Sequence, residues 1–427
     1  MILSSAWLFR FLSVCAFCLC GQCIACASSP IIPAIIAVAT VGLFVYCRGN
    51  AVVVWAAIGI GPIVNCTALY CDPYVYTIEI VILTYLGCFL GRNARTVSLK
   101  KPDGVLLSYI LLLIVLFCST VVHIFLLGGN IPLEIRLVRV FIIGLFLLMF
   151  LKSTQKPGLI IYAKTVVLTT LLISTIGLME FCVRGIFFHN WGREPQSVFN
   201  GSEILAMYLC STIPFIIMAR PMVAKGVWTY ISSFAAPLAL LLLITTRSRA
   251  GLLSLLVFLI FYGFHALRTK SRKSRTILVV VLISCLSVFA ITGLKTFHSG
   301  FHFSSDVARL LFLSRLGDWH NGIMVFKATP LWGAGSGNNF YNTYIQMLGN
   351  YGIFGLGAFL IFLVSIFVKY FRNAHSSFHA PFHQGLLWSA IVLLIAGIGE
   401  SLLGNQLGYY ILFLFFMVGR TPQNKII

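Results

Sequence analysis

Long apolar runs recur along the whole chain, and most of them are long enough to cross a lipid bilayer as helices. The hydrocarbon core of a bilayer requires about 20 consecutive apolar residues in helical conformation. Strands of a membrane barrel are about half as long and alternate in polarity, so these runs indicate helices. The candidate spans are 5–27, 31–47, 51–70, 76–91, 105–127, 134–151, 158–183, 203–219, 227–245, 250–267, 276–294, 352–369, 386–399 and 405–419.

The composition agrees with a chain embedded in lipid. Charged residues make up 9% of the 427 positions, against about a quarter in soluble domains, and the mean hydropathy is +0.99. We therefore predict an all-α fold, a polytopic transmembrane bundle of about 12–14 spans. The formal net charge of +20 is explained by Lys and Arg in cytoplasmic loops, so no nucleic-acid partner is expected.

The basic loops set the predicted orientation of the spans. With the spans above, all the basic clusters fall on one side, which the positive-inside rule assigns to the cytoplasm together with both chain termini. Most of the ten carboxylates fall on the other side, so carboxylate chemistry is predicted to be external. The basic clusters are Arg92–Lys101, Lys152–Lys156, Arg220–Lys225, Arg268–Arg275, Lys369–Arg372 and Arg420–Lys425.

A polar segment between two apolar runs, residues 295–342, is predicted to form a large external loop. It contains too many aromatic and aliphatic residues to be disordered, and long loops in compact proteins usually carry function. Within it, residues 303–327 have the pattern of an amphipathic helix that ends before Pro330. This segment is therefore the first candidate for a functional site.

The polar face of the predicted amphipathic helix carries its candidate residues. Arg315, Asp318 and Trp319 are spaced i, i+3 and i+4, so they share one face. That face either lies on the bilayer with an Arg315–Asp318 pair or binds an anionic lipid headgroup. Arg309 and His320 on the same helix are further candidates for substrate binding.

Two other external segments contain unusual polar residues. The loop 189–206 contains Arg193, Asn200 and Glu203, and either Asn200 or Ser202 is placed to cap the helix that begins near Glu203. Arg193 and Asn200 are also candidates for substrate binding.

The second segment is TTRSRAG, which places Arg247 and Arg249 where one span ends and the next begins. The positive-inside rule does not explain arginine at an external boundary. A guanidinium group binds phosphate through two hydrogen bonds and stays charged when partly desolvated. We therefore interpret these arginines as phosphate-binding residues, in preference to side chains that extend to the membrane interface.

The sequence lacks the usual motifs of metal or nucleotide chemistry. It contains neither HExxH nor G-x-S-x-G, and its cysteines are not grouped with histidines. The glycine-rich stretch 333–337 lacks the lysine and the strand–helix context of a nucleotide loop, although its N–H groups can contribute to an anion site. No cofactor is predicted, and charge handled by arginines suits a metal-independent transfer with a phosphate leaving group.

Four motifs follow one another in the second half of the chain: FNGSEILAMYL, TTRSRAGLLSLL, SRLGDWHNGIMVFKATPLWGAGSGNNF and YNTYIQMLGNYGIFGLGAF. In this order they resemble the O-antigen ligase and O-antigen polymerase superfamily of bacterial membrane glycosyltransferases. The resemblance covers about residues 180–372. It divides the chain into N-terminal transmembrane helices (1–180), a catalytic core with the external loop (181–372) and a C-terminal transmembrane hairpin (373–427).

The resemblance implies a multi-pass enzyme of the bacterial inner membrane with a periplasmic active site. Such enzymes transfer a glycan from undecaprenyl pyrophosphate to a sugar hydroxyl. The acceptor is lipid A-core in ligases and a second lipid-linked repeat unit in polymerases; we expect the ligase reaction, with the polymerase as the alternative. By position, Arg249 and Arg315 match family arginines that bind the donor pyrophosphate, and Arg193 is a candidate for a third.

One position departs from the ligase pattern. Ligases have a His before the Asn of the helix that follows the external loop, where it is proposed to help activate the acceptor hydroxyl; here the pair is Tyr341 and Asn342. Tyrosine, with an ordinary pKa of about 10, is a poor general base. The expected catalytic set is Arg249, Arg315, Tyr341 and Asn342. The base remains open among Glu194, Glu203, His302, Asp318 and His320.

Two other classes of protein share the hydropathy pattern. Secondary transporters usually have related halves with paired broken helices and charges near the bilayer midplane. This sequence has no convincing internal repeat, and its polar residues gather at the external side. The second class, a non-catalytic lipid-binding scaffold, is compatible with the missing His. The expected partners are the lipid-linked donor, a glycan acceptor and the bilayer.

Overall fold

The computed structural model describes residues 68–69, 75–76, 103–126, 131–153, 158–188, 201–269, 305–335, 340–373, 380–402 and 408–418. Most of the first four candidate spans and all of the span 276–294 lie outside the described residues. The site candidates Arg193 and Asn200 lie outside them as well. Two strands of two residues each, β1 (Ala68–Leu69) and β2 (Val75–Tyr76), pair antiparallel.

The rest of the described chain is helical, which confirms the predicted all-α membrane fold. The helices follow the apolar runs because backbone groups in lipid must be satisfied within their own segment. Judged by length and composition, five of the described helices can cross a membrane: α5, α7, α8, α9 and α13. The helices are α5 (Gly104–Leu126), α6 (Ile131–Ser153), α7 (Gly158–Phe188), α8 (Ser202–Val223), α9 (Val227–Thr245), α10 (Arg249–Thr269), α12 (Ser305–Ala328), α13 (Thr343–Asn373), α14 (Ala380–Ala396) and α15 (Gly408–Val418).

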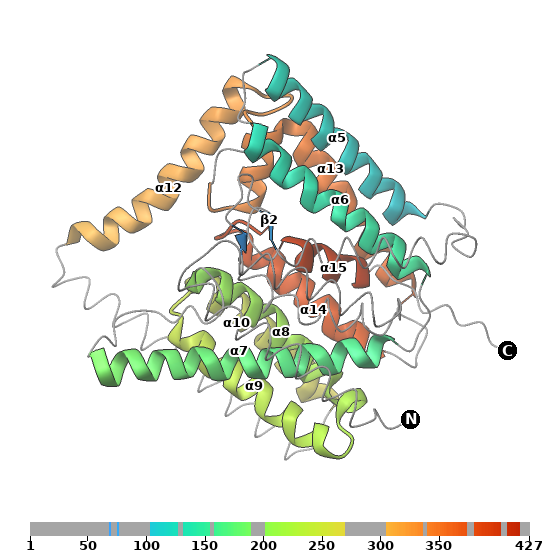
Figure 1. Ribbon diagram of the computed structural model, residues 1–427, viewed down its shortest axis with the longest axis vertical. Helices are drawn as coiled ribbons and strands as arrows, with labels where there is room; N and C mark the ends of the chain where they lie inside the picture. The colour runs from blue at the N-terminus through green and yellow to red at the C-terminus, as the bar shows by residue number, and fades with distance from the viewer. Residues whose placement is uncertain are drawn as a thin grey trace.

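The helices form two groups that α14 and α15 join (Figure 1). One group contains α5, α6 and α13; the other contains α7, α8, α9 and α10. Helix α14 packs chiefly against α8, and α15 packs against α6, α14 and α13. Helix α12, the predicted amphipathic helix, stands at the edge of the molecule and packs against α13.

A buried tyrosine ties the first group to α15. The Tyr109 hydroxyl of α5 donates a hydrogen bond to the carbonyl oxygen of Phe141 in α6, at 2.6 Å. Its ring centroid lies 5.2 Å from that of Phe362 in α13 and 4.8 Å from that of Phe416 in α15. An unpaired hydroxyl in this apolar core would cost about 1–3 kcal/mol. Tyr109 therefore fixes four helices through one satisfied side chain.

Helix α13 is interrupted at Gly352, whose φ is +68°. The turn that follows α12 pairs with the backbone groups near this break. The Ile353 N–H donates to the Pro330 carbonyl oxygen at 2.9 Å, and the Ala334 N–H donates to the Gly349 carbonyl oxygen at 2.9 Å. The C-terminal end of α12 is thereby bonded to α13 through the main chain.

Two polar side chains of α5 hold the same turn. Ser119 Oγ donates to the Trp332 carbonyl oxygen at 2.8 Å, and His123 Nε2 lies 2.8 Å from the Gly333 carbonyl oxygen. Because a carbonyl oxygen can only accept, His123 carries its proton on Nε2. The turn after α12 is thus fixed to both α13 and α5.

We expect Gly352→Ala to destabilise the protein. The left-handed backbone conformation costs about 1–3 kcal/mol for a residue with a side chain. In addition, a Cβ atom at this position would overlap the Leu331 carbonyl group. Gly357→Ala is the matched control, because it lies in the same helix and its Cβ would meet open space. Thermal unfolding of the detergent-solubilised variants measures both; an unchanged melting temperature for Gly352→Ala would show that the break tolerates a side chain.

The two predicted sides of the membrane lie at opposite ends of α13. Lys369, near its C-terminal end, forms an ion pair with Asp103, just before α5, and both were predicted to be cytoplasmic. At the other end, Thr343 Oγ1 donates to the carbonyl oxygen of Glu400 at 2.9 Å, and Glu400 was predicted to be external. The contacts therefore agree with the grouping of these residues into two faces.

Candidate active site

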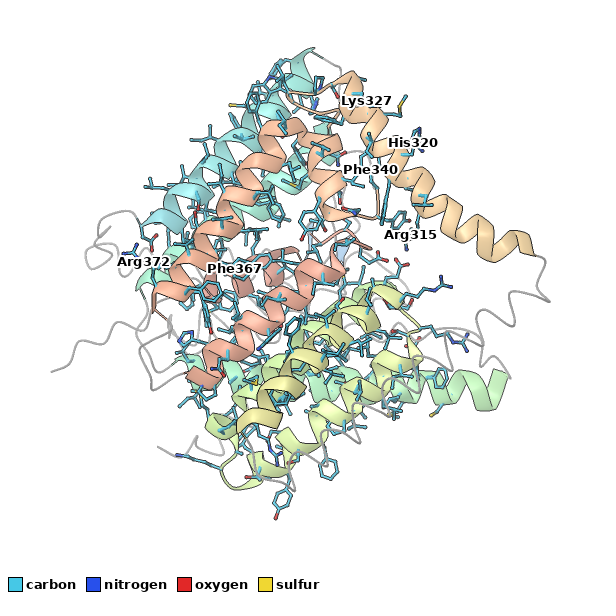
Figure 2. The ribbon with its side chains drawn as sticks, turned by 180° about the vertical axis from the view of Figure 1, so that it is seen from behind. Arg315, His320, Lys327, Phe340, Phe367 and Arg372 are labelled. Carbon is cyan, nitrogen blue, oxygen red and sulfur yellow. The ribbon has the colours of Figure 1, made fainter. Side chains whose placement is uncertain are left out.

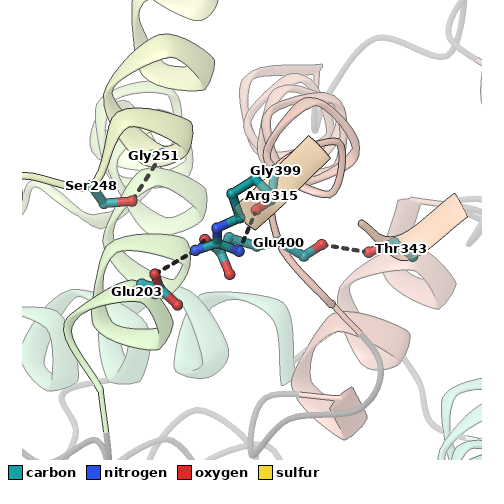
Figure 3. Close-up of polar contacts among 7 residues, drawn as sticks. All are labelled: Glu203, Ser248, Gly251, Arg315, Thr343, Gly399 and Glu400. Carbon is teal, nitrogen blue, oxygen red and sulfur yellow. Dashed lines mark hydrogen bonds and ion pairs between the residues drawn. The ribbon is translucent and has the colours of Figure 1, made fainter. Parts of the chain in front are cut away.

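Segments far apart in the sequence meet at one guanidinium group (Figure 3). Arg315 Nη2 donates to Oε1 of Glu203 at 2.7 Å and to Oε1 of Glu400 at 3.1 Å. Its Nη1 lies 3.4 Å from the carbonyl oxygen of Gly399. Arg315 belongs to α12, Glu203 to the first turn of α8, and Glu400 to the turn after α14. Helix α12 is thus joined to the bundle by its own arginine.

Close packing of α12 against α13 sets the place of this arginine. A Cβ atom at Gly322 would overlap the Ile345 side chain and lie 3.1 Å from the ring of Phe340, so glycine permits the close approach. Arg315 lies about two helical turns earlier. Figure 2 shows it on the side of α12 that faces the bundle.

The predicted polar face of α12 is present only in part. Asp318 and Trp319 are half-buried, as expected for residues that share the face of Arg315. His320 is exposed and lies on the opposite side of the helix (Figure 2). The charged partners of Arg315 are Glu203 in α8 and Glu400 in the turn after α14, rather than Asp318 on its own helix. Contacts between distant segments thus replace the predicted local pair, and headgroup binding by this face stays a prediction.

The aromatic ring of Tyr341 stacks on the guanidinium group of Arg315. The Cζ atom of Arg315 is 4.0 Å from the centroid of the Tyr341 ring. Such cation–π contacts contribute about 0.5–2 kcal/mol. Tyr341 has a φ of +47°, which is uncommon for a residue with a side chain. Backbone strain of this kind is found most often at functional sites.

Asn342 caps helix α13. Its Oδ1 accepts the N–H groups of Tyr344 and Ile345, at 2.9 and 3.0 Å, and its Nδ2 donates to the Ile398 carbonyl oxygen at 2.8 Å. Asn342 is 5% exposed. Through these contacts Asn342 stabilises the turn that carries Glu400. Its predicted catalytic role stays a prediction.

The TTRSRAG motif forms the tight connection between α9 and α10. Arg247 has a φ of +55° there. Ser248 Oγ accepts the N–H of Gly251 at 3.3 Å and so caps α10 (Figure 3). Arg247 and Arg249 are both exposed, as a residue that binds a ligand requires.

The start of α10 lies against the turn after α14, which carries Glu400, and against α8. A Cβ atom at Gly251 would lie 3.2 Å from the Cβ of Ala206, and one at Gly399 would lie 3.0 Å from the Cβ of Ala250. Helices α8, α10 and α13 therefore begin around one place. A helix N-terminus carries about half a positive charge and is suited to binding phosphate. Arg249, the first residue of α10, adds a full charge to this region.

The two carboxyl groups at Arg315 differ in their surroundings. The Glu400 side chain is 9% exposed, whereas that of Glu203 is 45% exposed. Burial, and after it the neighbouring Glu203 carboxylate, raise the pKa of Glu400 to about 8, although Arg315 acts in the opposite direction. Burial and the neighbouring carboxylate therefore favour the protonated form of Glu400. Among the described residues, no group of three or more His, Cys, Asp or Glu side chains is placed to bind a metal ion.

Three further sequence predictions concern the cap of α8, the glycine-rich stretch after α12, and Arg309. Helix α8 begins at Ser202 as expected, but its N-cap is Gly201, so Ser202 is its first residue and not its cap; Asn200, the other candidate cap, lies outside the described residues. The N–H groups of Gly333 and Gly335 donate to carbonyl oxygens of the protein, so they are not available to an anion. Arg309 lies on α12, within a part of the helix for which the structure describes only the backbone.

Glu400 was not among the predicted site residues. It lies 85 positions from Arg315 in the sequence, and only the fold brings the two together. The available signal was a single carboxylate directly after an apolar helix, in the stretch GIGES. This pattern indicates an external helix end, which was predicted, but it does not reveal which helix lies opposite.

Residues 234–360 match the family model described as O-antigen ligase. The match supports membership of the O-antigen ligase superfamily. It begins within α9 and ends within α13, so it includes Arg249, Arg315 and Tyr341. Glu203 and Glu400 lie outside the O-antigen ligase match and reach its arginine only through the fold. A comparison with curated proteins found no significant match.

Proposed function

We propose that the chain transfers a glycan from undecaprenyl pyrophosphate to a sugar hydroxyl at the periplasmic side of the bacterial inner membrane. The position of Arg315 is the observation that supports this function most. An arginine of the O-antigen ligase match is held over Tyr341, near the place where three helices begin. Positive charge fixed in advance in this way suits a pyrophosphate group.

In the proposed reaction, the acceptor hydroxyl attacks the anomeric carbon of the donor sugar. The new glycosidic C–O bond forms while the C–O bond to the pyrophosphate breaks, and its electron pair remains on the phosphate oxygen. Arg249 and Arg315 stabilise the charge that develops there, because fixed guanidinium groups need no reorganisation during the reaction. The proton of the acceptor hydroxyl passes to a base on the protein.

Two acceptors are compatible with this site. The first candidate is lipid A-core, with which the enzyme would be a ligase of lipopolysaccharide biosynthesis. Tyr341, at the position where the ligase pattern has His, favours the second candidate, a polymerase that joins lipid-linked repeat units.

Transfer by the purified protein tests this function. The protein in detergent is mixed with a lipid-pyrophosphate glycan and either lipid A-core or a second lipid-linked repeat unit, with a chelator and no nucleotide. We expect a new glycan product on a gel with one of the two acceptors. Product from neither acceptor, by a protein that unfolds cooperatively, would contradict the proposal.

The lipopolysaccharide of a deletion strain separates the two reactions. Loss of a ligase leaves lipid A-core without polymer, while polymer accumulates on the lipid carrier. Loss of a polymerase leaves single repeat units on the core. A lipopolysaccharide profile identical to that of the parent strain would contradict both reactions.

We expect Tyr341→Ala to reduce transfer by about 10-fold, because the cation–π contact that orients Arg315 is lost. Tyr341→Phe keeps the aromatic ring, so its rate is expected to stay within about threefold of wild type. Initial rates at saturating donor measure both. If Tyr341→Phe were as slow as Tyr341→Ala, the hydroxyl group would be required and the stacking role would be wrong.

A further inference from the structure

Two carboxyl groups share one arginine at the candidate active site, and their unequal exposure separates their possible roles. Glu203 is 45% exposed and sits in the first turn of α8, where a substrate can reach it. Glu400 is 9% exposed and lies behind Arg315, in the turn that Asn342 and Thr343 hold. Only Glu203 is accessible enough to contact an acceptor sugar.

The charges at this place have a consequence for donor binding. Arg315 carries one positive charge, and two ionised carboxylates would outweigh it. A pyrophosphate would then meet a net negative charge at the group that should attract it. With a proton on Glu400, the charges of Arg315 and Glu203 balance, and the neighbouring helix N-termini and Arg249 favour the anion.

Resting on the proposed glycosyl transfer, we propose that Glu203 is the general base that accepts the proton of the acceptor hydroxyl, while Glu400 is a positioning residue that orients Arg315. As the hydroxyl oxygen bonds to the anomeric carbon, its proton moves to the Glu203 carboxylate. The electron pair of the broken bond leaves with the pyrophosphate. No further reactant is needed, and Glu203 later releases the proton to water.

Among the candidate bases whose side chains the structure describes, Glu203, Asp318 and His320, Glu203 is the one that bonds to Arg315. Glu203 bonds directly to Arg315 at 2.7 Å, so an acceptor that it touches lies next to the predicted donor site. His320 points away from the bundle (Figure 2). Glu194 and His302 lie outside the described residues. A carboxylate also suits the task that the missing His performs in the ligase pattern.

The proposal predicts how donor binding depends on pH. Burial first, and the Glu203 charge second, raise the pKa of Glu400 to about 8, so a second negative charge develops beside Arg315 as the pH rises through that value. If only the protonated form binds donor, affinity falls about tenfold between pH 7 and pH 9. The charged groups that act on Glu400 are Glu203 from α8 and Arg315 from α12, and the Tyr341 ring before α13 stacks on the same arginine.

The experiment compares full-length wild type with Glu203→Gln, Glu400→Gln and the control Glu180→Gln, which makes the same change in α7. Transfer rates and direct binding of a lipid-pyrophosphate oligosaccharide are measured from pH 6 to pH 9. General base catalysis contributes about 10²–10⁴-fold, so Glu203→Gln should lower kcat by at least about 100-fold. Its donor affinity should be unchanged or tighter, because a negative charge beside Arg315 has been removed. In Glu400→Gln the loss of donor affinity above pH 8 should disappear.

The outcomes separate this proposal from the proposed function. If wild type makes no product, the glycosyl transfer itself is wrong and the base assignment is wrong with it. If wild type and Glu180→Gln transfer but Glu203→Gln keeps its kcat within about threefold, only the base assignment is overturned. A parallel loss of kcat and donor affinity in Glu203→Gln would indicate a structural role and would also overturn it. Persistence of the alkaline loss of affinity in Glu400→Gln would overturn the role of Glu400.

Discussion

Arg315→Ala is expected to reduce glycan transfer by about 100-fold or more, the usual effect of removing a preorganised group that stabilises developing charge. The physical reason is its position: it bonds to Glu203 and Glu400 and stacks on Tyr341, so the guanidinium group is held in place before the donor arrives. Initial rates of the purified variant, at saturating donor and acceptor, measure the loss.

Two further substitutions show which property of Arg315 matters. Arg315→Gln keeps a hydrogen-bond donor but removes the charge, so it should be nearly as slow as Arg315→Ala. Arg315→Lys keeps the charge but loses the planar fork that reaches both carboxyl groups, so an intermediate rate is expected. Normal transfer by folded Arg315→Gln would mean that this charge does not act on the pyrophosphate.

Arg249→Ala should also reduce transfer by about 100-fold, since it removes an exposed charge from the first residue of α10, beside the turn that carries Glu400. Arg372→Ala is the matched control. It removes the same charge from an exposed position in the last turn of α13, at the opposite end of that helix from the site. Its transfer rate should equal that of wild type.

The double variant tests whether the two arginines act on the same leaving group. If each binds a different phosphate of the donor, the two losses in activation free energy should add; if they act as one unit, the double variant should be little slower than either single variant. A normal rate for folded Arg249→Ala would remove this residue from the proposed mechanism.

The helices were predictable because hydrocarbon imposes a simple rule on sequence. The span predicted at 105–127 is α5 (Gly104–Leu126), and the amphipathic helix predicted at 303–327 is α12 (Ser305–Ala328). Lipid excludes charge and requires helical backbone, so apolar length places a span such as α5, whereas the amphipathic pattern of a polar segment predicted α12. The break of α13 at Gly352 was not predicted, because it depends on the turn at Pro330 lying against it.

Site residues could be predicted only where neighbouring residues in the sequence already indicate their role. Arg249 was predicted because arginine at an external helix end needs an explanation, and Arg315 because it shares the polar face of an amphipathic helix; the family resemblance pointed to both. The structure brings their two helices to one region. Glu400 was missed because its importance depends on contacts with residues far away in the sequence. The ring contact of Tyr341 could not be seen either, since a spacing pattern does not show which side chain stacks on a guanidinium group.

The hydrogen bonds from Ser119 and His123 to the turn after α12 give helix α5 an influence over the chemistry from a distance. Helix α12 is held at two places, at this turn and at the close contact of Gly322 with α13. Arg315 lies roughly 10 Å along the helix from Gly322. A tilt of a few degrees at these two places would therefore move the guanidinium group by a substantial fraction of an ångström. Substitutions in α5, outside the O-antigen ligase match, can thus affect the proposed transfer reaction by shifting the Arg315 guanidinium group, without changing any residue of the site.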